Sequence, residues 1–272
     1  MIVNRNATAI FARFSAIVIC AFFAIDFPFC LVAYGQATHV DLADLKQFRL
    51  NGAISKIHSK GAISIDGKCV LRLNDDLNQI SSVFLKKPVK FGVGTSFSTS
   101  FAFRLTDPKG YSGSDGPGGD GFAFVIQPRG NSAIGEFGGG LGYQGIDHSL
   151  AIEFDTWGNI PSDFPGGDPD GNHIGISVNG DPFSIATVGI DRRFNDGTVW
   201  YVWVDYDAAT HLLQVRASEN STRPVNASIT SRLNLQKTLK SDTAYLGFCS
   251  TTGGASNVQE ILSWEFTISE AK

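Results

Sequence analysis

Short runs rich in Phe, Val, Ile and Thr alternate along this chain with clusters of Gly, Asn, Asp and Ser. Such runs have the composition of β-strands, and the polar clusters between them are typical of turns. In Ser96–Leu105 the apolar residues recur at every second position, which predicts a strand with one buried side and one solvent-facing side. The chain has 30 glycines, and helix signals are scarce. The sequence therefore predicts an all-β chain built from antiparallel sheets.

The predicted strands are spread over most of the chain. They are Phe97–Leu105, Gly121–Gln127, Leu150–Thr156, His173–Asn179, Val199–Tyr206, Leu212–Ala217, Tyr245–Ser250 and Leu262–Ile268. The signal for a first strand is weak and rests on Phe48-Arg49-Leu50. Residues 36–272 contain no linker-like composition and no repeat period. Because all-β sandwiches often fill such a length alone, we expect one antiparallel β-sandwich domain over residues 36–272.

The first 35 residues differ from the rest of the chain. Two arginines precede the apolar runs Phe14–Ile25 and Phe27–Val32, which lead into the small residues of Ala33-Tyr34-Gly35. Each run is shorter than the roughly 20 apolar residues that span a bilayer. The pattern predicts a cleaved secretory signal peptide over residues 1–35, although an uncleaved anchor could use both runs. We therefore expect a secreted, extracellular protein (periplasmic or on the cell surface in a bacterium) with no membrane span after cleavage.

The charged residues exclude one class of partner. The formal net charge is -4, and the 22 Lys and Arg residues are scattered along the sequence. Nucleic-acid binding requires basic residues gathered into a patch or stripe. The sequence therefore predicts no nucleic-acid partner and favours a neutral or weakly charged ligand.

Two cysteines remain once the leader is set aside. Cys20 and Cys30 lie within it, whereas Cys69 and Cys249 lie in strand-like runs. In an oxidising compartment the second pair could form a disulfide, or it could remain as two buried thiols. The sequence leaves both alternatives open.

The residues that carry chemistry lie between Ala151 and Ile176. Side chains two apart along a strand point the same way, so Glu153 and Asp155 share one face. Two adjacent carboxylates repel each other unless they share a proton or a cation. The same stretch also supplies an amide oxygen, a third carboxylate and an imidazole, from Asn159, Asp168 and His173.

These ligand types fall into two groups. Carboxylate, amide and backbone carbonyl oxygens suit Ca²⁺, whereas an imidazole with several carboxylates suits a first-row ion such as Mn²⁺. Asp155 and Asp168 could bridge the two ions. The alternative is a solvated acidic turn beside a buried histidine, but so many ligand-type residues in one stretch favour a metal site.

This stretch resembles the metal-binding segment of the legume (L-type) lectins, the family of concanavalin A. The family segment reads Glu-x-Asp-Thr-aromatic-x-Asn, then Asp-Pro, then His-Ile/Val-Gly-Ile, and every part is present here in that order. Other segments similar to family motifs are Gly119–Phe124, Gly138–Gly142, Phe248–Gly253 and Leu262–Phe266. Gly142–Ile146 and Gly171–His173 resemble microbial members more than seed lectins. The resemblance implies a jelly-roll, concanavalin A-like β-sandwich.

The resemblance also implies a role for each matching residue. The implied ligands of the transition metal are Glu153, Asp155, Asp168 and His173. The implied ligands of calcium are Asp155, Asn159, Asp168 and the backbone carbonyl of Trp157. The implied sugar-binding groups are the Asp120 carboxylate, the Gly139 amide, the Asn159 side-chain amide and the Trp157 ring. In this family the peptide bond before the sugar-binding Asp is cis, which here is Gly119-Asp120.

The implied function is a secreted lectin that binds a mono- or oligosaccharide or a glycoconjugate without cleaving it, as a monomer or a homo-oligomer. One alternative is a glycoside hydrolase, in which a Glu-x-Asp-x-x-Glu run places two carboxylates on one strand. Here Gly158 stands in place of the second Glu. Another alternative is an adhesion or structural domain that has lost sugar binding, but Asp120, Gly139, Trp157 and Asn159 all match.

Two departures from the family pattern affect the site. The loop between Asn159 and Asp168 is longer than usual, which makes Asp163 a rival to Asp168 as a ligand. The serine that usually supports the metal site from beyond the His173 strand is expected at the position of Phe183, with Ser184 next to it.

Overall fold

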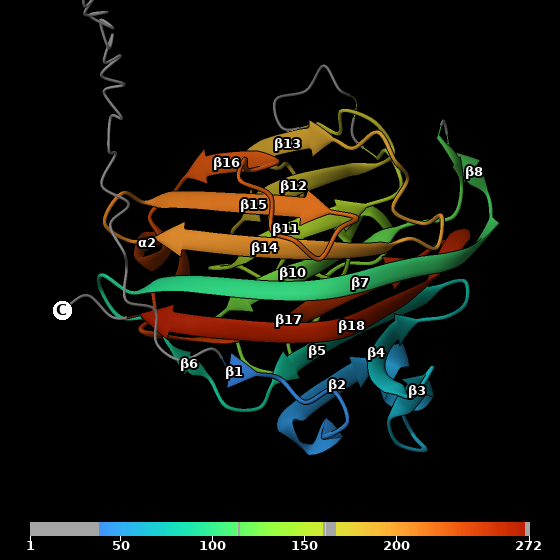
Figure 1. Ribbon diagram of the computed structural model, residues 1–272, viewed down its shortest axis with the longest axis horizontal. Coiled ribbons are helices and arrows are strands. Elements are labelled where there is room, and N and C mark those ends of the chain that lie inside the picture. Colours follow the sequence, from blue (N-terminus) through green and yellow to red (C-terminus); the bar gives the residue numbers. More distant parts are fainter. Residues whose placement is uncertain (1–37, 114, 160, 162–166, 270–272) are drawn as a thin grey trace, which may run out of the picture. The chain divides into compact units, whose positions relative to one another are not determined.

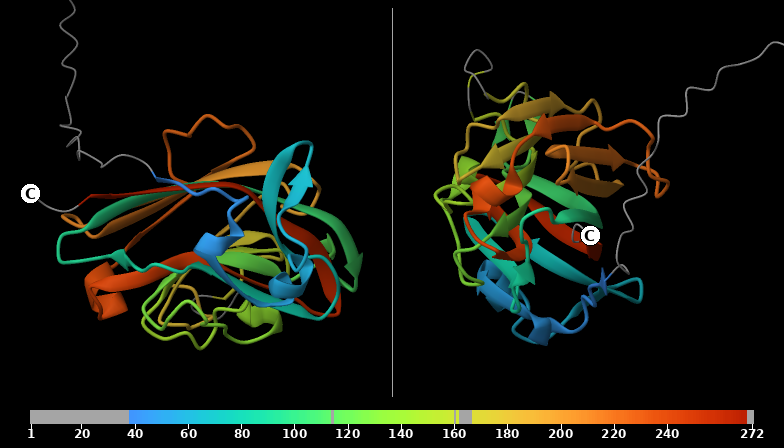
Figure 2. Two further views of the ribbon diagram at one scale, coloured as in Figure 1. Left: turned by 90° about the horizontal axis from the view of Figure 1, so that it is seen from below. Right: turned by 90° about the vertical axis from the view of Figure 1, so that its left-hand side faces the viewer.

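Two antiparallel sheets face each other, and the chain passes repeatedly between them (Figures 1 and 2). The computed structural model describes residues 38–113, 115–159, 161 and 167–269, all of which belong to one compact unit, Ala33–Lys272. The predicted all-β, antiparallel sandwich is confirmed. The predicted signal peptide and Asp163 lie outside the described residues.

The first sheet has eight strands in the order β16-β15-β14-β7-β18-β4-β3, with β1 pairing with β18. Their bounds are β1 Thr38–His39, β3 Ile63–Ile65, β4 Lys68–Asn74, β7 Ser96–Gly110, β14 Val199–Asp207, β15 Leu212–Ser218, β16 Ile229–Arg232 and β18 Ala255–Ser269. The long strands β7 and β18 run side by side through its centre (Figure 1).

The second sheet also has eight strands, in the order β13-β12-β11-β10-β17-β5-β2, with β6 pairing with β17. Their bounds are β2 Phe48–Gly52, β5 Gln79–Leu85, β6 Val89–Lys90, β10 Gly121–Gln127, β11 Leu150–Asp155, β12 His173–Val178, β13 Ala186–Gly189 and β17 Thr243–Thr252. A two-stranded hairpin, β8 (Ser112–Gly113) and β9 (Gly116–Pro117), extends from β7. The helices are short: η1 Leu45–Gln47, α1 Ala53–Ile57, η2 Gly138–Gly140 and α2 Leu235–Leu239.

Strand β10 is buried on both of its faces. Phe122, Phe124 and Ile126 point into the core between the sheets. Ala123 and Val125 point the other way, into a second apolar cluster that includes residues from the loop after β10. The loop residues of that cluster are Leu141, Tyr143 and Ile146. The loop around η2 is therefore anchored to the outer face of the second sheet.

Each predicted strand run coincides with an observed strand, and the weak first-strand signal corresponds to β2. Gly121–Gln127 matches β10 residue for residue, whereas β7 and β18 are longer than predicted. Strand β5, whose central Ser81-Ser82 reads as a turn, was not among the predictions.

The two cysteines are free thiols. Cys69 lies on β4 in the first sheet and Cys249 on β17 in the second, where it is fully buried. Of the two alternatives left by the sequence, the structure has the one without a disulfide.

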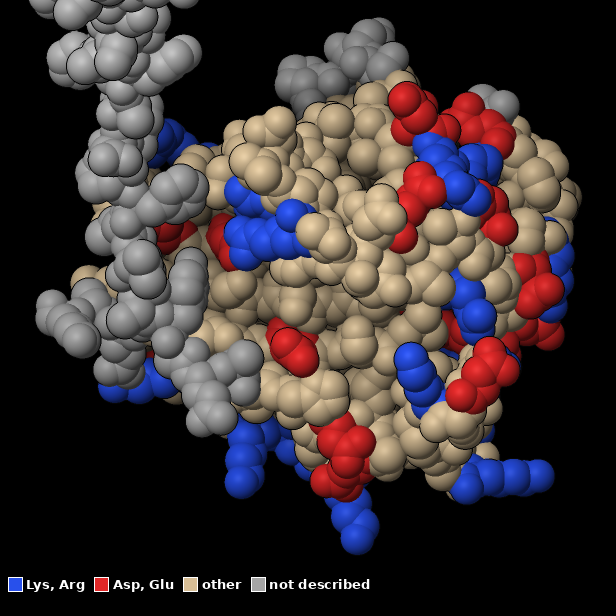
Figure 3. All heavy atoms as spheres, viewed as in Figure 1, with Lys and Arg blue, Asp and Glu red and all other residues tan. Residues whose placement is uncertain are grey.

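Two surface properties bear on partners. On the face drawn in Figure 3, the described Lys and Arg side chains are interspersed with Asp and Glu. Among the described residues, no helix has the length and apolar character needed to cross a membrane.

Candidate functional site

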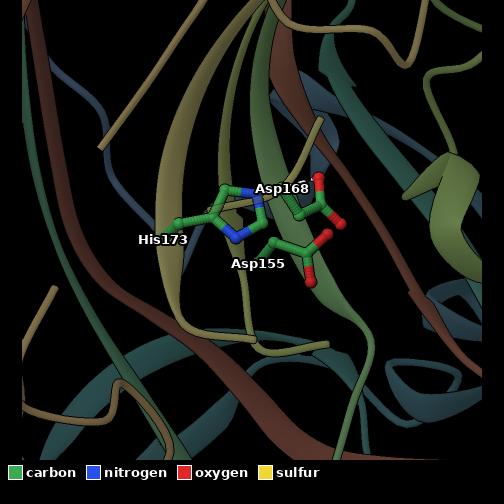
Figure 4. Close-up of side chains that lie close together, drawn as sticks. All are labelled: Asp155, Asp168 and His173. Atoms are coloured by element: carbon green, nitrogen blue, oxygen red, sulfur yellow. Dashed lines mark ion pairs between the residues drawn. The ribbon is translucent and has the colours of Figure 1, made fainter. Parts of the chain in front are cut away.

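A buried triad forms where β11 and β12 lie next to each other. Asp155 ends β11 and His173 begins β12, and the two residues are direct partners across the ladder. Asp168, from the loop between these strands, completes the group (Figure 4). One ligand atom from each residue lies within 4.8 Å of those of the other two. The residues are 3%, 8% and 0% exposed for Asp155, Asp168 and His173 respectively.

The imidazole of His173 has the orientation of a metal ligand. Its Nδ1 lies 3.1 Å from the backbone carbonyl of Asp170, which can only accept, so Nδ1 carries the proton. Its Nε2 is buried and makes no hydrogen bond to the described residues, although Asp168 Oδ1 is 3.4 Å away. An unsatisfied buried nitrogen facing two carboxylates fits a divalent first-row ion.

Burial dominates the electrostatics of the triad. It raises the pKa of Asp155 well above its usual range, and the charges of Glu153 and Asp168 raise it further. Burial opposes protonation of His173, but the surrounding carboxylates outweigh it and raise the pKa of that imidazole to about 9. The cluster therefore holds protons tightly unless a cation takes their place.

Glu153 lies beside the triad and is held by two hydroxyl groups. Ser184 Oγ donates to its Oε1 at 2.5 Å, and the Tyr143 hydroxyl donates to its Oε2 at 2.8 Å. A Cβ on Gly175 would lie 1.9 Å from Oε1, so glycine is required opposite this carboxylate. The expectation that Phe183 occupies the supporting position is wrong: Phe183 is 43% exposed, and Ser184 provides the hydroxyl.

The loop after β11 is shaped by the triad's carboxylates. The backbone amide of Trp157 donates to Asp155 Oδ1, and that of Asn159 donates to Asp168 Oδ2, both at 2.6 Å. These bonds attach Trp157 and Asn159 directly to the triad. The structure thus brings Asp168 together with Asp155 and His173.

Asp120 lies just before β10, and the predicted cis peptide bond between Gly119 and Asp120 is present. Its side chain is 6% exposed, and Thr251 Oγ1 lies 3.4 Å from Oδ2 while donating to the Gly138 carbonyl at 2.6 Å. Thr251 therefore links the Asp120 loop to the η2 loop. Burial raises the pKa of Asp120 to about 6, although the hydrogen bond from Thr251 acts to lower this pKa.

The remaining predicted sugar-binding groups meet at the same place. A Cβ on Gly139 would lie 2.5 Å from Cγ of Asn159, so the Asn159 amide lies directly against the η2 backbone. A Cβ on Gly119 would lie 3.3 Å from the Trp157 ring, and one on Gly113 would lie 3.5 Å from it. Asn159 is exposed and Trp157 is partly exposed. Three loops thus converge above the triad.

Tyr143 and Thr251 were not among the residues predicted from the sequence. The partner of Thr251, Gly138, is distant in sequence, and the partner of Tyr143, Glu153, belongs to the next strand. A hydroxyl residue alone does not reveal such a buried partner. Thr251 lies within Phe248–Gly253, a segment that resembles a family motif.

The match to known proteins covers most of the chain. The model of the legume lectin domain matches residues 44–272. The chain belongs to the legume lectin domain family. It is 29% identical to a galactose-binding lectin of Arachis hypogaea, with 90% of each chain covered. The structure of winged bean acidic lectin complexed with methyl-α-D-galactose superimposes with a TM-score of 0.68 at 27% identity, covering 87% of this chain and 99% of that one.

Other relatives are larger proteins. The chain is 30% identical over 264 residues to the L-type lectin-domain containing receptor kinase VIII.1 of Arabidopsis thaliana, which covers 91% of this chain. It spans 34%, 42% and 33% of the length of three such receptor kinases. These relatives are plant proteins, and the resemblance to microbial members stays a prediction.

Proposed function

We propose that this domain binds carbohydrate without cleaving it, through Asp120, Gly139, Trp157 and Asn159. The observation that carries this proposal is the convergence of three loops above the buried triad. A pyranose presents an apolar face to an aromatic ring and an edge of hydroxyls to a carboxylate and amides. Asp120 and Asn159 offer such polar groups, and Trp157 offers the ring. Small-ligand sites depend on a few polar groups held in place in this way.

Two metal ions would hold the loops. A first-row ion such as Mn²⁺ would be bound by Asp155, Asp168 and His173, joined by Glu153. Ca²⁺ would be bound by the carboxylates of Asp155 and Asp168, the side chain of Asn159 and the carbonyl of Trp157. The ions supply positive charge that balances the clustered carboxylates. The fit is supported by the unsatisfied Nε2 of His173 and by the backbone bonds that already link Trp157 and Asn159 to the carboxylates.

We further propose that residues 1–35 are a secretory signal peptide and that residues 36–272 act outside the cell. The family match over residues 44–272 supports a lectin domain that fills residues 36–272. The binding of galactose by the peanut relative, as its name states, supports a saccharide ligand. The absence of a second Glu at Gly158 supports binding without hydrolysis.

A glycan array probed with and without a chelator tests this function. A lectin gives signals on a defined set of glycans that disappear with the chelator. A domain that has lost sugar binding gives no signal in either condition. A glycoside hydrolase releases reducing sugar from glycans on prolonged incubation. The second or third result would contradict the proposal.

A further inference from the structure

Three hydroxyl groups surround the carboxylate of Glu153 behind the triad. Tyr143 donates to Oε2 at 2.8 Å and Ser184 donates to Oε1 at 2.5 Å. Ser177 Oγ lies 3.1 Å from the Tyr143 oxygen and 2.8 Å from the Ser184 oxygen, which closes a ring. All four side chains are buried, with Tyr143 and Ser177 at 0% exposure.

When Glu153 is ionised, every hydroxyl proton of this ring can be given an acceptor. A carboxylate then only accepts, so Tyr143 and Ser184 each give their single proton to it. Ser177 gives its proton to one of the other two hydroxyl oxygens, which still have lone pairs. Every hydroxyl proton therefore has an acceptor, and both Glu153 oxygens have a donor. Such a fully satisfied buried network favours one orientation of its members.

The ring is built from segments that also carry the site. Glu153 lies on the same face of β11 as Asp155, and Ser177 lies on the same face of β12 as His173. Gly175, between His173 and Ser177, leaves the space that the carboxylate fills. Tyr143 belongs to the loop that begins with η2, and its ring is part of the apolar cluster on the outer face of the second sheet.

We propose that Tyr143 is a positioning residue for the first-row metal ion, acting through Glu153. Its hydroxyl, together with Ser184, holds the Glu153 carboxylate in the orientation in which it lies beside Asp155, Asp168 and His173. Hydrogen bonds of this kind orient metal-binding groups, and their loss weakens metal affinity by about 10–100-fold. The inference rests on the proposed function, because it assigns Tyr143 a role in the ion site proposed there.

The same residue would connect the ion to the sugar-binding loop. Tyr143 lies in the η2 loop, which contributes Gly139, and its partner Glu153 lies two residues before Asp155 on β11. An ordered Glu153 therefore stabilises the loop from below, while Thr251 holds it from the side of Asp120.

Tyr143→Phe tests the inference, since it removes the hydroxyl and keeps the ring in the apolar cluster. Chelator-treated, dialysed full-length protein is titrated with Mn²⁺ alone, and free Mn²⁺ is followed by electron paramagnetic resonance. We expect about 10–100-fold weaker Mn²⁺ binding than in the unaltered protein. We also expect a changed visible absorption spectrum of bound Co²⁺, which a purely structural role of Tyr143 would not produce.

Tyr206→Phe is the matched control. Tyr206 lies on β14 in the other sheet and is 2% exposed. Its hydroxyl accepts a hydrogen bond from the backbone amide of Leu235. It loses a buried hydroxyl in the same way, so we expect a lower melting temperature with unchanged Mn²⁺ affinity. Ser184→Ala removes the other hydrogen bond to Glu153 and provides a second test should Tyr143→Phe fail to fold.

The outcomes separate this inference from the proposed function. If the unaltered protein binds no Mn²⁺, the proposed metal site is wrong and the inference falls with it. If the unaltered protein binds Mn²⁺ and a folded Tyr143→Phe or Ser184→Ala variant binds it within about twofold, with the same Co²⁺ spectrum, the inference alone is overturned.

Discussion

Asp120 is a buried carboxylate that accepts a side-chain hydrogen bond from the Thr251 hydroxyl. Asp120→Asn keeps its shape and removes the charge that strengthens hydrogen bonds from sugar hydroxyls. The loss of two such bonds, at about 1.5–3 kcal/mol each, would weaken sugar binding by roughly ten-fold to thousands-fold. Isothermal titration against the best array ligand measures the loss, and a melting curve should show little change because no core atom changes.

The control for this substitution is Asp66→Asn. Asp66 is exposed, lies in the turn between β3 and β4, and has a positive φ that Asn also tolerates. We expect the Asp66→Asn variant to bind sugar with the affinity of the unaltered protein. Unchanged affinity in Asp120→Asn as well would remove Asp120 from the site.

His173 gives the protein without ions a definite pH dependence. Its folded-state pKa of about 9 lies above the ordinary value of 6.5, so its contribution to stability is fully present below pH 6.5 and is lost as the pH rises through 9. The raised pKa of Asp155 acts in the same direction, because folding binds its proton. The chelated protein should therefore melt at a lower temperature at pH 9 than at pH 6.

Added ions should reverse this trend. Metal binding displaces protons from the ligands, so the stabilisation that ions provide should grow between pH 6 and pH 9. Melting curves with and without Mn²⁺ and Ca²⁺ across this range measure both effects. A stabilisation by ions that is constant or falls with pH would contradict the assignment of His173 as a ligand.

At the scale of elements, the loop between β11 and β12 carries the site. Asp168 accepts from the Asn159 amide and lies beside His173, so Asp168→Ala removes a ligand and releases the loop. We expect this variant to lose the increase in melting temperature that Mn²⁺ and Ca²⁺ give. Asp163→Ala should keep that increase. Equal loss from both substitutions would contradict the choice of Asp168 over Asp163 as the metal ligand.

Three strands of the first sheet are joined by an ion cluster around one buried glutamate. Glu260 on β18 is 1% exposed and accepts from Arg72 on β4 at 2.6 Å and from Arg104 on β7 at 2.7 Å. Glu260→Gln leaves two arginines without a countercharge, which should lower the free energy of unfolding by about 2–4 kcal/mol. Urea denaturation measures the change. The exposed Glu265→Gln, which pairs with His39, should change it by less than about 1 kcal/mol.

The sequence predicted the strands better than the contacts between them. Alternating apolar residues identified β7, and continuous apolar runs identified β10 and β11, because burial imposes those patterns directly. The Glu-x-Asp spacing placed Asp155 in the triad, since two residues on one strand share a face. The hydroxyl of Tyr143 on Glu153 left no such pattern, because a loop residue reaches a strand residue only after the fold has formed.

At the scale of the whole molecule, the two sheets provide the base on which the loops of the site lie. The core between the sheets fixes β10, β11 and β12, and the second apolar cluster fixes the η2 loop on their outer face. Beneath these loops, burial raises the pKa of Glu153 and of Asp155, both on β11. We therefore expect ions to bring these loops into their binding state, and ions that bind only the native state also stabilise it.

Sugar binding before and after removal of metal tests this claim most directly. Chelated and dialysed protein is titrated calorimetrically with the best array ligand, then titrated again after Mn²⁺ and Ca²⁺ are added back together. We predict no measurable binding without metal, recovery of the original affinity with both ions, and a lower melting temperature in the chelated protein. Sugar affinity in the chelated protein equal to that of the untreated protein would contradict this prediction.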